Sequence, residues 1–88
     1  MFIVYNKIML NKNKLLEIIS KSIKVNKKKI NINSSKEDFK NWDSLAHLKI
    51  LTEIDKHTNG KASEINNLAE QTKISNLYKI LIKKKLAK

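Results

Sequence analysis

Residues 42–58 read WDSLAHLKILTEIDKHT, and the fold of the chain is organised around this stretch. Its regularly spaced apolar residues are Leu45, Leu48, Leu51 and Ile54. A spacing of three places these side chains along one face of a helix. Asn59-Gly60 follows, which favours a left-handed helix end. The pattern predicts an amphipathic helix over 44–58, with Asp43 or Ser44 as its N-terminal cap.

Three further helices are predicted on either side of this one. Residues 12–24 and 74–86 each combine an apolar stripe with lysines on the opposite face or in the last turns. Residues 63–71 are long enough for only about two turns, and Ser63 could cap them. The apolar stripes, in chain order, are Leu15, Ile18, Ile19, Ser22 and Ile23; then Ile65 and Leu68; then Ile74, Leu77, Tyr78 and Leu81.

The connection formed by residues 25–43 has no sustained periodicity and is long for a compact domain. Apolar side chains at Ile30, Ile32, Phe39 and Trp42 are expected to fasten it across the helices. We predict that Phe39 and Trp42 are largely buried. A short helical turn is expected near residues 35–40. The INI triplet at residues 30–32 suggests a strand, but no partner strand exists, so none is predicted.

The expected fold is therefore all-α: a single domain over residues 1–88, with four helices and a core at about 12–86. Residues 1–8 form either a non-essential extension before Met9 or an ordered segment that packs on the bundle. The apolar stretch at residues 1–10 is too short to span a bilayer and lacks a signal-peptide pattern.

Size and cysteine content limit the classes of function. A chain of 88 residues has room for a small core and favours a binding or carrying role over catalysis. The chain contains no Cys, which excludes disulfides, thiolate metal sites and a cysteine nucleophile. We therefore expect a protein of the reducing cytoplasm that is not an enzyme.

The charge is strongly positive, at +11, yet every basic residue is Lys. Lysine, asparagine and isoleucine make up nearly half the chain, as an AT-rich coding sequence would produce. The alternative function is a small Lys-rich protein that binds nucleic acid or ribosomes through residues 21–29 and 83–88. The absence of Arg weakens this alternative. Binding to a membrane surface through the same lysines is a third possibility.

Asp43-Ser44-Leu45, preceded by Trp42 and by a long loop, resembles the acyl carrier protein family. The resemblance covers residues 12–86. It implies a four-helix acyl-carrier-like bundle with a long loop between helices one and two and a short third helix. It also implies a 4′-phosphopantetheine arm, taken from coenzyme A and attached covalently to Ser44.

The resemblance further implies the roles of neighbouring residues and the partners. Asp43 would help a phosphopantetheinyl transferase to hold Mg²⁺, and Leu45 would pack beside the arm and contact partner enzymes. These enzymes would be an acyl-activating ligase and an acyltransferase or synthase that use the thioester, with the carrier acting as a monomer. The expected docking residues are His47, Leu48, Lys49, Glu53 and Asp55. Without the family pattern, Leu45 and Leu48 would be assigned to the core.

Elementary chemistry supports an attachment at Ser44. The amide groups and the dipole at a helix N-terminus favour an anion such as a phosphodiester. No cysteine of the chain would compete for the acyl group. The competing interpretation, that Asp43 or Ser44 only caps the helix, is the commonest role of such residues.

Two other kinds of site are considered and set aside. His47 follows Ser44 by one turn on the same helix face, but the sequence supplies neither an orienting group nor an oxyanion site for a serine nucleophile. His47 and His57 lie about 15 Å apart along a helix axis, so they cannot share a metal ion. No metal site is expected, and His47 is interpreted as a surface residue beside the arm.

The chain also departs from the family. Carriers of this kind are usually acidic, above all on helix two, whereas residues 43–58 contain three acids and two lysines. Ala46 and Lys49 stand where the family often has acids. A specialised carrier, of the type found in surface-polysaccharide, amino-sugar and lipid-tailoring pathways, fits better than housekeeping fatty-acid synthesis. Either an acyl or an aminoacyl group could be the cargo.

Overall fold

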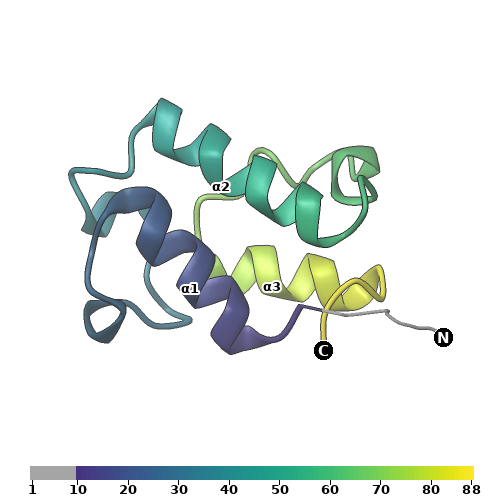
Figure 1. Cartoon of the computed structure of the whole chain (residues 1–88), viewed down its shortest axis with the longest axis horizontal. Helices are drawn as coiled ribbons and strands as arrows, with labels where there is room; N and C mark the ends of the chain where they lie inside the picture. Colours follow the sequence, from purple (N-terminus) through teal and green to yellow (C-terminus); the bar gives the residue numbers. More distant parts are fainter. Residues whose placement is uncertain (1–9) are drawn as a thin grey trace, which may run out of the picture.

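The computed structural model describes residues 10–88, and the predicted extension at residues 1–8 lies outside them. The described chain contains α1 (Lys12–Ile23), α2 (Ser44–His57) and α3 (Ile74–Lys83), shown in Figure 1. Single 3-10 turns lie between them: η1 (Lys27–Lys29), η2 (Lys36–Asp38) and η3 (Ala62–Glu64). The all-α class is confirmed, but the described residues form three α-helices, not four. Helix α1 packs against both α2 and α3.

The three helices bury most of the residues that their periodicity selected. On α1 the whole predicted stripe is buried, and on α3 only Tyr78 is half-buried. The core comprises Leu10, Leu15, Leu16, Ile18, Ile19, Ile23, Ile30, Trp42, Ala46, Ile50, Ile54, Ala62, Leu68, Ile74, Leu77, Leu81 and Ala87. Leu10 and Ala87 lie just outside the predicted core limits of 12–86. Packing of such apolar side chains is the main source of stability in a chain without disulfides.

A side-chain cap explains where α1 begins, and left-handed backbone conformations explain where α1 and α2 end. The Asn11 side chain caps α1 by accepting a hydrogen bond from the Lys14 amide at 2.8 Å. Lys24, with φ of 58°, adopts the left-handed conformation that stops α1. After α2, Asn59 and Gly60 have φ values of 56° and 81°, so the predicted left-handed turn is confirmed.

The predicted helix over residues 63–71 is wrong. Only the 3-10 turn η3 forms, and residues 66–70 continue as turns. Ser63 does not cap a helix: its amide donates to Asp55 Oδ1 and its hydroxyl to the Gly60 carbonyl. These bonds hold the segment to the end of α2, and an Asn-Asn pair has little intrinsic preference to continue a helix. Ile65 is half-buried and Leu68 is buried, as expected of the segment's anchors.

The third α-helix is shorter than predicted, since α3 ends at Lys83 and not at residue 86. Lys85 turns into the left-handed region with φ of 63°, and the chain then runs beside Leu10. The Leu10 amide donates to the Leu86 carbonyl at 3.1 Å, and the Lys88 amide donates to the Leu10 carbonyl at 2.8 Å. Continuing the helix would have prevented this pairing and the burial of Ala87.

The long connection at residues 25–43 is held by side chains and by one backbone tie. Ile30 and Trp42 are buried, while Ile32 and Phe39 are half-buried against the core. The burial predicted for Trp42 is thus confirmed, and that of Phe39 is only partial. The turn expected near 35–40 is present as η2, and residues 30–32 form no strand.

An isolated antiparallel bridge ties this loop to the segment before α3. It pairs Ser35 with Lys73. The Lys36 amide donates to the Thr72 carbonyl at 2.8 Å, and the Ile74 amide donates to the Ser34 carbonyl at 3.0 Å. The bridge therefore fixes the middle of the loop that precedes α2 to the start of α3.

Helix α2 faces the core with a different stripe from the one predicted. Ala46, Ile50 and Ile54 are buried, whereas Leu45 is 76% exposed and Leu48 is 60% exposed. Leu51 is half-buried beside the core. The two leucines near the start of α2 therefore point outward, and the expectation that they belong to the core is wrong.

Candidate functional site

Ser44 is the first residue of α2 and is exposed to solvent. Asp43 precedes it as the N-cap, and its Oδ1 accepts a hydrogen bond from the Ala46 amide at 2.9 Å. Of the two capping candidates, Asp43 has this role. The Ser44 hydroxyl makes no hydrogen bond with any other residue in the described range 10–88. It is therefore available for chemistry at the positive end of a helix.

The exposed leucines lie directly beside this serine. Leu45 follows Ser44 in the chain, and Leu48 lies one turn further along α2, on the same face as Leu45. Large apolar side chains that remain in water on a small domain often mark a contact surface. The start of α2 thus presents an exposed hydroxyl together with an apolar surface.

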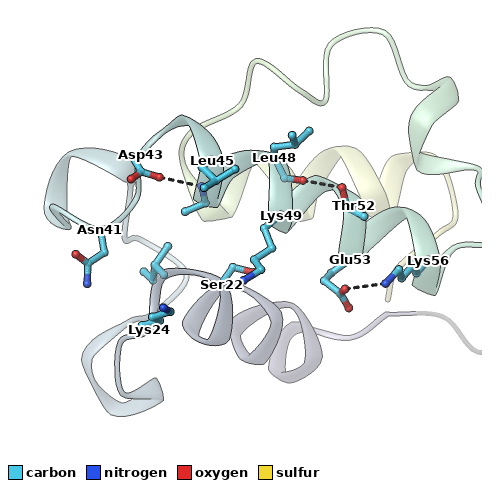
Figure 2. Close-up of a pocket in the computed structure, with 12 residues that line it drawn as sticks. Ser22, Lys24, Asn41, Asp43, Leu45, Leu48, Lys49, Thr52, Glu53 and Lys56 are labelled. Atoms are coloured by element: carbon cyan, nitrogen blue, oxygen red, sulfur yellow. Dashed lines mark hydrogen bonds and ion pairs between the residues drawn. The ribbon is translucent and has the colours of Figure 1, made fainter.

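An open groove of about 610 Å³ runs between α1 and α2 next to this surface (Figure 2). Its lining residues are Ser22, Ile23, Lys24, Asn41, Asp43, Leu45, Ala46, Leu48, Lys49, Thr52, Glu53 and Lys56. In Figure 2 the Lys49 side chain extends from α2 towards Ser22 of α1, and Lys24 lies where α1 ends. Ser44 is outside the groove, although Asp43 and Leu45 on either side of it contribute to the wall.

A second hollow of about 250 Å³ continues the groove along α1. It shares Ser22, Lys49 and Glu53 with the first and ends near His57. The distance from His57 Nδ1 to the Glu53 carbonyl oxygen is 2.9 Å. Because the two hollows share Ser22, Lys49 and Glu53, we treat them as one groove between the helices and call it the α1–α2 groove.

The acids near the groove are largely neutralised by lysines. Glu17 lies 3.1 Å from Lys21 and 3.7 Å from Lys14, and Glu53 lies 3.3 Å from Lys56. A hydrogen bond from Lys21, assisted by the charge of Lys14, holds the pKa of the Glu17 carboxyl below its ordinary value. Glu17 is therefore a carboxylate with two lysines beside it.

Trp42 and His47 form a hydrogen-bonded pair beneath the start of α2. The Trp42 Nε1–H donates to His47 Nδ1 at 3.0 Å, and the two rings are stacked with centroids 6.1 Å apart. Because an indole nitrogen can only donate, His47 Nδ1 must accept. The proton of the neutral ring is then on Nε2, which donates to the Ala69 carbonyl at 2.8 Å.

This arrangement assigns His47 a structural position that sequence reasoning missed. Half-buried, its ring links Trp42 of the long loop with Ala69 of the segment after α2. Both ring nitrogens are occupied, so His47 is in no position to take a proton from Ser44. No sequence signal pointed to this bridge, because Ala69 contributes a backbone atom.

The remaining predicted docking residues lie on different sides of α2. Lys49 and Glu53 line the groove, whereas Asp55 is directed towards the segment after α2 and accepts a hydrogen bond from the Ser63 amide. Asp55 also borders a separate hollow of about 270 Å³ beside Leu51 and Leu68. The structure thus brings Leu45, Leu48, Lys49 and Glu53 together, and it places His47 and Asp55 in contact with residues 63–69.

Comparisons with known proteins give no match to this chain, whether by family model, by curated protein or by solved structure. Across residues 10–88, no helix is both long enough and apolar enough to cross a membrane. The same residues contain no group of three or more His, Asp or Glu side chains that could hold a metal ion.

Proposed function

We propose that this protein is a carrier that holds its cargo on a 4′-phosphopantetheine arm attached to Ser44. The observation that carries the proposal is the environment of Ser44. It is the first residue of α2, it is exposed to solvent, and it does not cap the helix, because Asp43 does. An exposed helix-start serine with no structural duty is suited to covalent modification by another enzyme. The outward-facing Leu45 supplies an apolar neighbour for the arm.

The chain's own residues fit such an arm. In the attachment reaction the Ser44 Oγ would bond to the phosphorus next to the pantetheine of coenzyme A, its proton would pass to a base of the transferase, and 3′,5′-ADP would leave. The amides and dipole at the start of α2 stabilise the resulting phosphodiester. Asp43 uses only Oδ1 for its cap among the described residues, so its second oxygen can serve a transferase-held Mg²⁺. Once bound, the arm provides a thiol that carries an acyl or aminoacyl group as a thioester.

More specifically, we propose a specialised, free-standing monomeric carrier of the cytoplasm and not the general carrier of fatty-acid synthesis. An acidic docking helix would require acids at positions such as Ala46 and Lys49. Ala46 is buried, and Lys49 lines the groove as a cation. A dedicated activating ligase and one acyltransferase or synthase would then use this surface.

The test is the intact mass of the protein after incubation with coenzyme A, Mg²⁺ and a broad-specificity phosphopantetheinyl transferase. The wild type is expected to gain one 4′-phosphopantetheine group. Ser44→Ala should stay folded and gain none, while Ser63→Ala, which changes another exposed serine, should be modified normally. An unchanged wild-type mass with several transferases would refute the proposal.

A further inference from the structure

The exposed apolar residues of this protein are concentrated beside the proposed attachment site. Within residues 10–88, the large hydrophobic side chains that remain exposed are Leu45, Leu48 and Ile82. Two of the three belong to the first turns of α2 and border the α1–α2 groove. An isolated exposed leucine needs no explanation, but two on one helix face beside a groove form a contact patch.

The groove around this patch carries a net positive charge, because five lysines and three acids line it. Glu17 and Glu53 are paired with lysines, and Asp43 caps the helix. Lys24 and Lys49 have no ion-pair partner among the described residues, and both are exposed. The excess charge of the groove is therefore cationic, with Lys49 beside Leu45 and Leu48 on α2 and Lys24 at the end of α1.

We infer that the α1–α2 groove receives an enzyme surface with an apolar centre and acidic edges. The apolar centre covers Leu45 and Leu48, and the acidic edges face Lys24 and Lys49. This inference rests on the proposed function, and it inverts the usual polarity of carrier recognition, in which the carrier is acidic. Complementary charges of this kind act mainly on the rate of encounter and on the rejection of wrong partners.

A protein surface fits the groove better than a nucleic acid does. Five lysines line the groove, but Lys14, Lys21 and Lys56 are already paired with Glu17 or Glu53, and phosphates would leave Leu45 and Leu48 without apolar contacts. They would also meet the carboxylates of Glu17, Asp43 and Glu53. An interface core is typically apolar with a charged rim, which is the arrangement seen here.

The experiment measures how fast two forms of one phosphopantetheinyl transferase modify the carrier at low salt. One form keeps a basic carrier-facing surface, and the other has those basic residues changed to Glu. The wild-type carrier is expected to be modified about tenfold faster by the acidic form, a factor within the range of electrostatic steering. Lys24→Glu/Lys49→Glu should reverse this preference. The difference should shrink as added salt shortens the Debye length.

The matched control is Lys61→Glu/Lys79→Glu, which changes the net charge equally at exposed sites outside the groove. It should keep the wild-type preference. Equal rates with both transferase forms, or a control that shifts as much as the groove variant, would overturn the groove assignment while modification of Ser44 still supports the carrier function. No modification by either form would overturn both.

A second readout addresses nucleic acid directly. Binding of a labelled single-stranded oligonucleotide is measured at physiological salt for the same three proteins. We expect the groove variant and the control variant to bind the oligonucleotide equally weakly, so that no binding depends on Lys24 and Lys49. If such binding is found, the groove is a nucleic-acid site and the inferred enzyme surface is wrong.

Discussion

Trp42 is the largest fully buried side chain, and its indole nitrogen has one acceptor, His47 Nδ1. Replacing His47 with Leu leaves this donor without a partner, which should lower the free energy of unfolding by about 1–3 kcal/mol. In a Trp42→Phe background the same replacement should cost less, because no indole N–H remains. Urea denaturation of the four proteins measures this coupling.

His47→Asn is the control for this pair. Its amide oxygen can accept a hydrogen bond near the position of Nδ1, so it should cost less than His47→Leu. If His47→Leu costs the same in the wild-type background as in the Trp42→Phe background, the bond seen between the rings does not stabilise the fold.

At the residue scale, the candidate site could be identified from the sequence, but the hydrogen bonds of His47 beside it could not. Ser44 and Asp43 could be placed because a helix start has local chemical rules. The partners of His47 could not, because one lies five residues away across a helix boundary and the other is a carbonyl of residue 69. Contacts to backbone atoms leave no trace in residue type.

Among the elements, α2 makes the sharpest prediction, since Leu45 and Leu48 of the predicted stripe are exposed while Ala46 and Ile50, outside that stripe, are buried. Ile50→Ala should lower the free energy of unfolding by about 2–5 kcal/mol, because Ile50 is fully buried. Leu45→Ala and Leu48→Ala should each change it by at most about 0.5 kcal/mol, as exposed positions do. Urea denaturation of these single variants distinguishes the two stripes. If either leucine variant lowered the free energy of unfolding as much as Ile50→Ala does, that leucine would belong to the core, as the sequence pattern predicted.

The reason for this exchange is visible in the sequence once the structure is known. Apolar residues occur on more than one face of α2, so the predicted stripe competes with one through Ala46, Ile50 and Ile54; the predicted stripe is Leu45, Leu48, Leu51 and Ile54. Periodicity cannot choose between them, because the choice depends on where α1 lies. The same limit explains the incorrect helix at 63–71, where Ser63 donates hydrogen bonds to Asp55 Oδ1 and to the Gly60 carbonyl.

The molecule as a whole is closed by contacts between the two ends of its described chain. Leu10 is buried and pairs with residues 86–88. Leu10→Ala keeps the backbone hydrogen bonds but removes the side chain, and it should cost about 2–5 kcal/mol. Leu45→Ala removes the same atoms from an exposed site and is the control. Urea denaturation that finds the two variants equally stable would show that the end of the chain is not part of the cooperative unit.

This pairing also has a kinetic consequence. Joining Leu10 to Ala87 closes a loop of almost the whole chain, so the contact is favourable only after the helices have assembled. Leu10→Ala should therefore accelerate unfolding and leave the refolding rate nearly unchanged. The chain has no proline, so no slow isomerisation should obscure a stopped-flow measurement of both rates. A refolding rate that falls with the lost stability would instead mean that the two ends meet before the barrier is crossed.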